Sequence, residues 1–270
     1  MLEGLSKLIK TNISYFPRLF KISKAEFFVN NGETDLGWIW NILKPMLYIG
    51  MFYLAINLGF KSAKDIKGIV CPYIIWLASG IFPWFYLQKA IFGGAKCFKS
   101  NKALIYKANY PVTVMPMIPG VSGLLNHFFL VGILIVITLL SGVKPSITWL
   151  QIPFYTCMMF IFSYCWSFFT GLCTVISADF FNFIKSIRPA FFWLSGIFFN
   201  SRATDRANPI FFLFNPITYC VEGYRNCVCY NMWFWENMKA LEAFMIVNIV
   251  LAILSFILYQ RLKKSLPDII

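Results

Sequence analysis

The sequence FFWLSGIFFNSR, residues 191–202, and the sequence IFFLFNPITYCVEGYR, residues 210–225, decide how this chain is organised. The first apolar run stops after nine residues at Asn200, Ser201 and Arg202, and the second breaks at Asn215-Pro216. A helix needs about 20 apolar residues to cross the hydrocarbon core, so neither run spans a membrane alone. Unpaired backbone groups cost several kcal/mol each in hydrocarbon, so such breaks occur where protein buries them or where they line a water-filled path. This stretch is therefore the best pointer to function.

The composition around this stretch indicates a polytopic membrane protein and excludes a soluble domain. The chain is 59% hydrophobic and 13% charged, with a mean hydropathy of +0.67. Five apolar stretches are long enough to cross a membrane, at residues 38–60, 69–92, 112–140, 149–176 and 241–259. With the broken stretch as a further crossing, we expect an all-α integral membrane fold with six transmembrane helices. Residues 1–270 then form one transmembrane domain, with a six-helix bundle at 36–260 and a tail at 261–270.

The first 35 residues carry a different pattern. Apolar residues recur at steps of three and four with lysines and an arginine between them, and Pro17 is expected to interrupt the segment. This predicts an amphipathic segment lying flat on the cytoplasmic membrane surface, either as an anchor or as a mechanical element. Because the segment lacks the apolar core and cleavage site of a signal peptide, we expect it to remain on the mature protein.

The net charge of +13 is interpreted as a signal for orientation in the membrane, and no nucleic acid partner is expected. If both termini are cytoplasmic, most of the 24 lysines and arginines fall in cytoplasmic segments, as the positive-inside rule requires. The basic loop at residues 61–67 departs from this bias, because it lies outside in the same orientation.

No pattern in the sequence indicates catalysis, a cofactor or a metal site. The eight cysteines lack the paired spacing of metal sites and are interpreted as packing residues, with a disulfide among Cys220, Cys227 and Cys229 as the alternative. His127 is interpreted as a hydrogen-bonded packing residue. The stretch GGAKCFKS, residues 93–100, falls one residue short of a phosphate-binding loop, because Phe98 replaces the glycine that lets such a loop wrap phosphates. We therefore expect no nucleotide hydrolysis by this chain.

The loop at residues 93–111 has four lysines and no acidic residue, alternating with apolar residues. One interpretation is a basic loop that only sets orientation. The other is a short helix that docks into a second protein on the cytoplasmic side. Aromatic residues make up 19% of the chain and fit the interfacial belts of any membrane protein, although Tyr53 and Trp84 belong to a group that could stack on sugars instead.

Four motifs give the chain a family resemblance along nearly its whole length: LGWIWNILKP at 36–45, GIFPWF at 80–85, KANYP at 107–111 and NPITYCVEGYR at 215–225. With these, the chain resembles the permease subunits of ABC-2 type (type V) exporters of lipid-linked polysaccharides. The motifs VKP at 143–145 and WFWE at 233–236 look closest to the wall teichoic acid exporter permeases of Gram-positive bacteria. Two positions depart from the family pattern: Ala178-Asp179 stands where Arg-Asp is usual, and Ser195-Gly196 where Ser-Pro is frequent.

The resemblance implies a homodimer in the bacterial cytoplasmic (cell) membrane, multi-pass and with both termini cytoplasmic, bound to two copies of a separate ABC ATPase subunit. It implies a re-entrant segment between the fifth and sixth helices, and a non-enzymatic role in which the partner hydrolyses ATP. The substrate would be a lipid-linked polysaccharide, most of all a teichoic acid for cell wall biogenesis. The expected contacts to the ATPase are Lys99, Lys102, Leu104 and Tyr106. The expected translocation path or outer gate comprises Trp84, Tyr53, Asn215, Pro216, Tyr219, Glu222 and Arg225, with Glu222 and Arg225 spaced to pair on one helical face.

Three alternatives remain open at this stage. The same machine could carry O-antigen, capsular or rhamnose polysaccharide. A membrane-embedded glycosyltransferase or acyltransferase would need clustered Asp, Glu or His residues, whereas the carboxylates here are scattered. An ion-coupled transporter would need two matching broken helices in inverted halves, whereas only the C-terminal half has an obvious break.

Overall fold

The structure, a computed structural model, describes residues 2–32, 35, 37–59, 69–199, 209–263 and 266, and for residues 2–9, 29–32, 56, 57, 59 and 209 it describes the backbone. Asn200, Ser201, Arg202 and the basic loop at 61–67 lie outside these residues. All regular structure in the described ranges is helical, in agreement with the all-α prediction.

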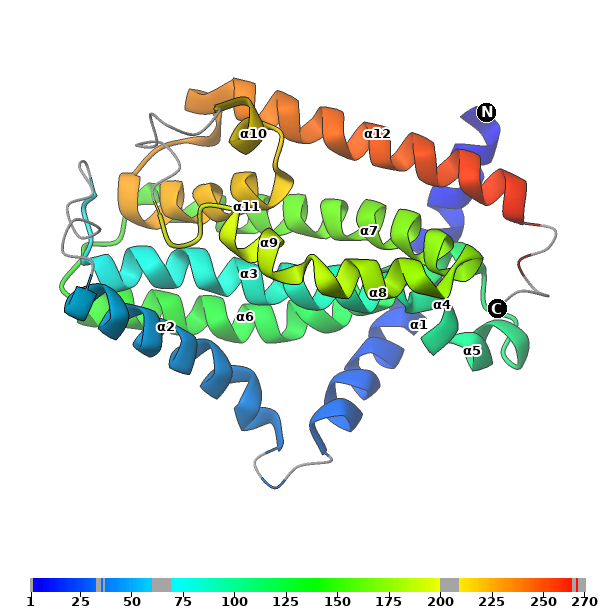
Figure 1. Ribbon diagram of the computed structural model, residues 1–270, viewed down its shortest axis with the longest axis horizontal. Coiled ribbons are helices and arrows are strands. Elements are labelled where there is room, and N and C mark those ends of the chain that lie inside the picture. The colour runs from blue at the N-terminus through cyan, green and yellow to red at the C-terminus, as the bar shows by residue number, and fades with distance from the viewer. Residues whose placement is uncertain are drawn as a thin grey trace.

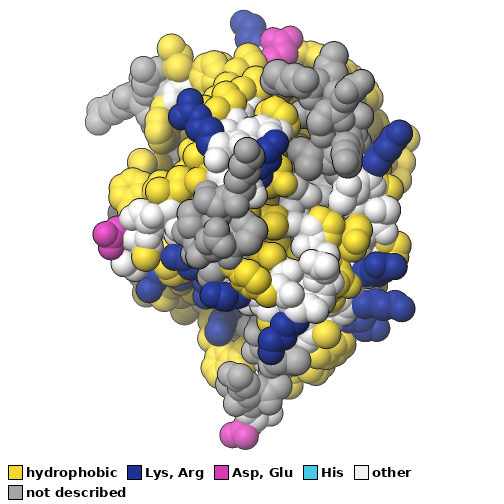
Figure 2. All heavy atoms as spheres, turned by 90° about the vertical axis from the view of Figure 1, so that its right-hand side faces the viewer, with side chains coloured by type: hydrophobic (Ala, Val, Ile, Leu, Met, Phe, Trp, Pro, Cys, Tyr) yellow, Lys and Arg dark blue, Asp and Glu magenta, His cyan; other side chains and the backbone are white. Residues whose placement is uncertain are grey.

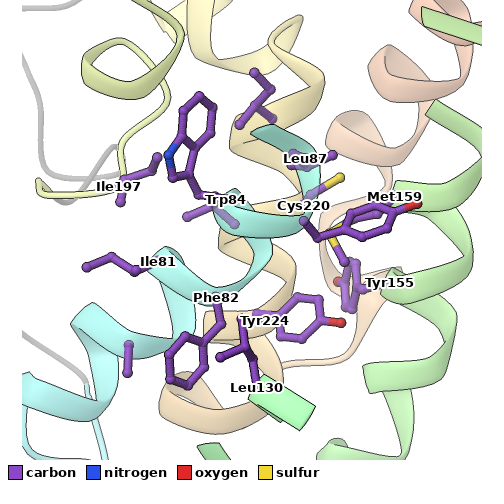
Figure 3. Packing of buried hydrophobic residues seen from close by; sticks show 14 of the residues in the cluster. Ile81, Phe82, Trp84, Leu87, Leu130, Tyr155, Met159, Ile197, Cys220 and Tyr224 are labelled. Atoms are coloured by element: carbon purple, nitrogen blue, oxygen red, sulfur yellow. The ribbon is translucent and has the colours of Figure 1, made fainter. Parts of the chain in front are cut away.

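The long helix α3 (Tyr73–Ala95) lies at the centre of a bundle formed with α6 (Met117–Leu140), α7 (Ile152–Ile176) and α12 (Met238–Leu262) (Figure 1). Most residues of α3 from Ile75 to Ala95 are buried, as expected for a helix that is largely apolar on all sides. Close packing against α7 depends on Gly94, since a β-carbon there would collide with Ser167. Figure 3 shows part of the buried core around α3, where Phe82 lies close to Leu130 of α6 and Tyr224 of α11.

Three stretches of the described residues are long and apolar enough to cross a membrane: Val112–Leu140, Ile147–Ile176 and Phe234–Leu262. They coincide with the third, fourth and sixth predicted crossings. All three begin with 3-10 turns: η3 (Val112–Val114), η4 (Ile147–Gln151) and η7 (Phe234–Asn237). The crowding of prolines at 111–119 accounts for the irregular entry to α6. The other three predicted crossings stay predictions. They involve α2 (Trp40–Gly59), which follows the turn η1 (Gly37–Ile39), the helix α3, and the broken stretch.

The N-terminal segment is one continuous helix, α1 (Leu2–Gly32), which crosses one end of the bundle instead of running along it (Figure 1). The prediction of an interruption at Pro17 is wrong. A proline removes one backbone donor and crowds the preceding turn, but packing on both sides holds the helix together. Asn12 Nδ2 donates to Tyr164 Oη at 2.8 Å, and Leu19 and Ser23 are fully buried.

The end of the bundle that α1 crosses also carries α4 (Cys97–Ser100) and α5 (Lys102–Tyr106), and the C-terminal end of α12 lies there too (Figure 1). Figure 2 views this end and shows lysine and arginine side chains spread across it. Exposed basic residues on or next to α4, α5 and the end of α12 include Lys99, Lys102, Lys107, Arg261 and Lys263. A basic surface of this kind is expected at the cytoplasmic end, and the assignment of this end to the cytoplasm stays a prediction.

The broken stretch consists of α8 (Ala178–Ser186), α9 (Arg188–Trp193), α10 (Pro209–Leu213) and α11 (Pro216–Arg225), followed by a π-helical turn η6 (Asn226–Tyr230) and the 3-10 turn η7 (Phe234–Asn237). The apolar run at 191–199 is thus not a single helix, because α9 ends at Trp193 and Gly196 has φ of +67°. The run at 210–214 stops at Asn215-Pro216, as predicted. All eight cysteines are free thiols.

Candidate translocation and coupling site

Asn215 is the first of two residues that tie the broken stretch together. Its side-chain oxygen accepts hydrogen bonds from Ile217 N at 3.0 Å and Thr218 N at 3.4 Å, which caps α11, while Pro216 takes the first helical position. Its amide nitrogen donates to Leu194 O at 3.2 Å. One side chain thus starts α11 and holds the end of α9.

Arg225 is the second, and it lies at the opposite end of α11. Its guanidinium donates to Gly196 O at 2.7 Å and to Ile197 O at 2.6 Å, and it pairs with Glu222 at 2.8 Å. It also lies on the Trp76 ring of α3, 3.4 Å from the ring centroid. The predicted pairing of Glu222 with Arg225 is confirmed, but Arg225 is fully buried and holds the turn at 194–197, so the described chain does not present it as an exposed cation.

These two residues and the turn at 194–197 form one unit, which we call the clamp. Its contacts satisfy backbone carbonyls where α9 stops, which is what an interrupted helix inside a membrane requires. A glycine in α3 makes room for it, because a β-carbon at Gly80 would lie 2.7 Å from Arg225 Nη2. The clamp therefore fixes the broken stretch to the central helix.

Glu222 and Tyr219, two further predicted gate residues, line a cavity of about 270 Å³ between α7, α11 and α12. The Tyr219 ring stacks on Phe244 at 4.5 Å, and its hydroxyl has no hydrogen-bond partner among the described residues. Glu222 is 12% exposed and lines the cavity together with the polar residues Thr218, Asn226 and Asn237. This cavity combines aromatic surface with oxygen atoms, the chemistry that suits a sugar ring.

The predicted aromatic residues Tyr53 and Trp84 occupy different positions. Trp84 is buried and faces Phe192 of α9, with ring centroids 5.4 Å apart, and Figure 3 places it beside Ile197. Tyr53 is half-buried on α2. Next to Tyr53, Phe52 packs against the rings of Phe192 and Phe198, so aromatic side chains connect α2 to the broken stretch.

Tyr224, which precedes Arg225 in α11, belongs to a network of three buried polar side chains. Tyr224 Oη lies 2.5 Å from His127 Nε2 and 2.6 Å from Thr156 Oγ1, which joins α6, α7 and α11. The interpretation of His127 as a hydrogen-bonded packing residue is thereby confirmed. Tyr224 and Trp76 were not singled out from the sequence, because a tyrosine or tryptophan in an apolar helix carries no local sign of its partner.

The predicted coupling residues lie on α4 and α5, which form two short helices in place of the single one considered from the sequence. Cys97 and Phe98 anchor α4 beneath α7, and Ile105 anchors α5. Burial raises the pKa of the Cys97 thiol. Lys99, Lys102 and Tyr106 are exposed, and Leu104 is partly buried. The stretch at 93–100 is helical, with GGA closing α3 and CFKS forming α4, so it does not wrap a phosphate.

The structure thus brings Asn215, Pro216, Tyr219, Glu222 and Arg225 together on α11, with Trp84 nearby. Lys99, Lys102, Leu104 and Tyr106 lie apart from them, on α4 and α5 at the basic end of the bundle (Figure 1). Two distinct regions result: one around the broken stretch and one at the basic end.

Comparisons with known proteins find relatives of full length. The chain is 21% identical over 268 residues to an O-antigen export system permease protein RfbA of Klebsiella pneumoniae, covering 98% of this chain and 100% of the relative. A protein with the same name from Myxococcus xanthus is 18% identical over 221 residues, covering 81% of this chain and 83% of its own length. No protein-family model matches the chain.

Proposed function

We propose that this chain is the membrane-spanning permease subunit of an ATP-driven exporter that moves a lipid-linked polysaccharide across the cytoplasmic membrane. The single observation that carries the proposal is the clamp: a broken apolar stretch whose reversal is stabilised by Asn215 and Arg225 against the central helix. Full-length similarity to proteins named as O-antigen export permeases supports it.

In this proposal the broken stretch is a fifth crossing followed by a re-entrant segment that faces outward. The buried guanidinium holds the reversal, while Tyr219, Glu222, Trp84 and Tyr53 belong to the walls near it. Polysaccharide is hydrated, so its path needs polar backbone and aromatic faces in place of a continuous lipid-like surface. Arg225 then acts as the structural centre of the gate and does not bind substrate in the state described here.

The basic end is the cytoplasmic side in this proposal, with both termini there. Lys99, Lys102, Leu104 and Tyr106 would contact the ATPase, since α4 and α5 are anchored from within and present lysines outward. Two ATPase copies and a homodimer of the permease complete the assembly. The chain itself hydrolyses no ATP.

Two cargoes are considered. The relatives are named for O-antigen export, which favours an O-antigen type polysaccharide. The motifs at 143–145 and 233–236 favour a teichoic acid. Trp233 and Trp235 of the second motif stack at 4.5 Å with their planes 8° apart, so they form a local aromatic platform at the outer end in this orientation.

Affinity purification of the tagged full-length chain from its own cells tests the subunit assignment. We expect a soluble subunit with a complete phosphate-binding loop to co-purify, and ATP hydrolysis to be lost when the lysine of that loop is replaced. A stable, transport-competent chain that purifies without any ATPase would overturn the proposal.

A further inference from the structure

A cavity of about 520 Å³ lies at the basic end, between α1, α3, α6, the end of α4 and α8–α9. Its volume falls within the range of roughly 300–1,000 Å³ that is usual for ligand pockets. Four cationic side chains line it, together with one carboxylate: Lys89, Lys96, Lys185, Arg188 and Glu26. These residues come from four helices and the residue between α3 and α4, so the cluster is produced by folding.

The charges in this cavity are unequally compensated. Glu26 interacts electrostatically with Lys89, whose ammonium also donates to Ser122 O at 3.4 Å. Within the described part of the chain, Lys96, Lys185 and Arg188 have no carboxylate partner. Three positive charges are therefore held around one cavity without a carboxylate partner among the described residues.

Aromatic rings hold these three cations in place. Lys96 Nζ and Lys185 Nζ lie 5.7 Å and 5.8 Å from the centroid of the Phe181 ring. The Arg188 guanidinium lies 5.3 Å from the centroid of Phe92. Cation–π contact orients each charged group but leaves its hydrogen-bond donors available. Ordinary orientation signals need no such convergence, since single lysines in solvated loops suffice for them.

The ligand that fits is an anion with several acceptor oxygens, attached to an apolar group. A phosphate offers three or more oxygens to ammonium and guanidinium donors, and arginine binds it with paired hydrogen bonds. Phe92, Phe181 and Pro119 supply apolar wall beside the cations. The cavity lies where α3 reaches the basic end of the bundle, which is headgroup depth if this end is cytoplasmic.

We propose that this cavity binds the phosphate or diphosphate group of a lipid in the cytoplasmic leaflet. The inference rests on the proposed function for its biological meaning, because a phosphate or diphosphate ester is the group that joins a polymer to a lipid carrier. It assigns Lys96, Lys185 and Arg188 to headgroup binding, with Lys89 held as a supporting charge by Glu26.

Binding of three probes to the purified full-length chain in neutral-lipid nanodiscs tests this: farnesyl diphosphate, phosphatidylglycerol and inorganic diphosphate. We expect a lipid probe to bind more tightly than inorganic diphosphate, and binding to weaken as ionic strength rises. The double variant Lys185→Gln, Arg188→Gln should weaken lipid binding by roughly tenfold or more, as expected when charge-assisted hydrogen bonds are lost. Lys96→Gln gives an independent test from a different element.

The matched control is the double variant Lys263→Gln, Arg261→Gln, which removes the same two charge types from exposed positions at the same end. It should bind within about twofold of the parent chain, since exposed charges outside the site act only through screened fields. Equal weakening in both double variants, or none in either, would overturn the proposal, as would equal affinity for inorganic diphosphate and for both lipids. A preference for farnesyl diphosphate over phosphatidylglycerol supports a polymer carrier, and the reverse supports a membrane phospholipid.

Because the assay measures binding and not export, its failure is separable from that of the proposed function. If the cavity shows no preference for lipid probes, the proposed exporter function is not affected. Conversely, the chain could bind the headgroup while its depletion leaves all surface polysaccharide unchanged. That result would support the proposed lipid site and contradict the proposed exporter function.

Discussion

The guanidinium carbon of Arg225 lies 3.4 Å from the centroid of the Trp76 ring, so a residue of the broken stretch rests directly on the central helix. The same guanidinium binds two consecutive carbonyls, Gly196 O and Ile197 O, and the carboxylate of Glu222. A cation is stable in this buried position because its donors are occupied and its charge is paired. Arg225 therefore holds, together with Asn215, the turn that follows α9.

Replacing Arg225 by alanine is expected to destabilise the protein strongly. Removing one partner of a buried ion pair costs about 3–5 kcal/mol, because the remaining charge and the carbonyls lose their partners. Thermal unfolding in detergent measures the effect. Arg225→Lys should lie between the parent and Arg225→Ala, since an ammonium keeps the charge but cannot reproduce the planar fork. The exposed Arg261→Ala is the control, and equal melting temperatures for Arg225→Ala and Arg261→Ala would contradict the clamp.

Gly80→Ala tests the same contact from the side of α3. Alanine is favoured over glycine in a helix by about 1 kcal/mol, so a site with room should gain stability. At Gly80 the new β-carbon would lie 2.7 Å from Arg225 Nη2, whereas at Gly50 of α2 nothing lies within 4 Å. We expect Gly80→Ala to lower the melting temperature and Gly50→Ala to leave it unchanged or raise it. The reverse order would show that Arg225 is not held against α3.

The Tyr224 hydroxyl is expected to stabilise the join between α6, α7 and α11. Tyr224→Phe removes the hydroxyl that lies within hydrogen-bond distance of both His127 and Thr156. Thr156 Oγ1 keeps its hydrogen bond to Ile152 O, whereas His127 Nε2 loses its described partner, which costs about 1–3 kcal/mol for a buried polar atom. Tyr48→Phe is the control, because the described contacts of Tyr48 are those of its ring. Chemical or thermal unfolding should separate the two variants by more than 1 kcal/mol. Equal stabilities of the two variants would show that the Tyr224 hydroxyl does not stabilise the contact between these helices.

The exposed lysines of α4 and α5 are expected to contact the ATPase. The double variant Lys99→Glu, Lys102→Glu reverses two charges without touching the buried anchors Phe98 and Ile105, so folding should be preserved. Co-purification of the ATPase should fall at least tenfold, because like charges across an interface cost several kcal/mol. Lys144→Glu, on an exposed lysine at the opposite end of the bundle, is the control. Normal ATPase binding and transport in the double variant would exclude a coupling role.

The breaks in the chain could be predicted because their signals are local. Asn215 precedes a proline and caps a helix, and the apolar run before it is too short to span. The continuity of α1 through Pro17 could not be predicted, because burial of Leu19 and Ser23 against other elements overrides the tendency of proline to interrupt a helix. The cationic cavity is a further case: Lys89 and Lys96 lie far in sequence from Lys185 and Arg188, and all four resemble ordinary orientation charges until the helices pack.

The position of Arg225 shows the same limit in a different form. Its spacing from Glu222 was sufficient to predict the ion pair, which is a contact within one helix. Its hydrogen bonds to Gly196 O and Ile197 O and its contact with Trp76 link segments distant in sequence, so spacing carried no sign of them. Arg225 was expected in a water-filled path, but it is buried and stabilises the turn at 194–197.

Depletion of this protein in its own cells tests the central claim most directly, with diphosphate-linked lipids extracted and surface polysaccharide measured on intact cells. The account predicts that one lipid-linked polymer accumulates inside, protected from periodate added outside, while the same polymer disappears from the surface. Re-expression of the parent chain should restore export, and the identity of the accumulated polymer decides between a teichoic acid and an O-antigen type cargo. Normal surface polysaccharide with no internal accumulation would contradict the account.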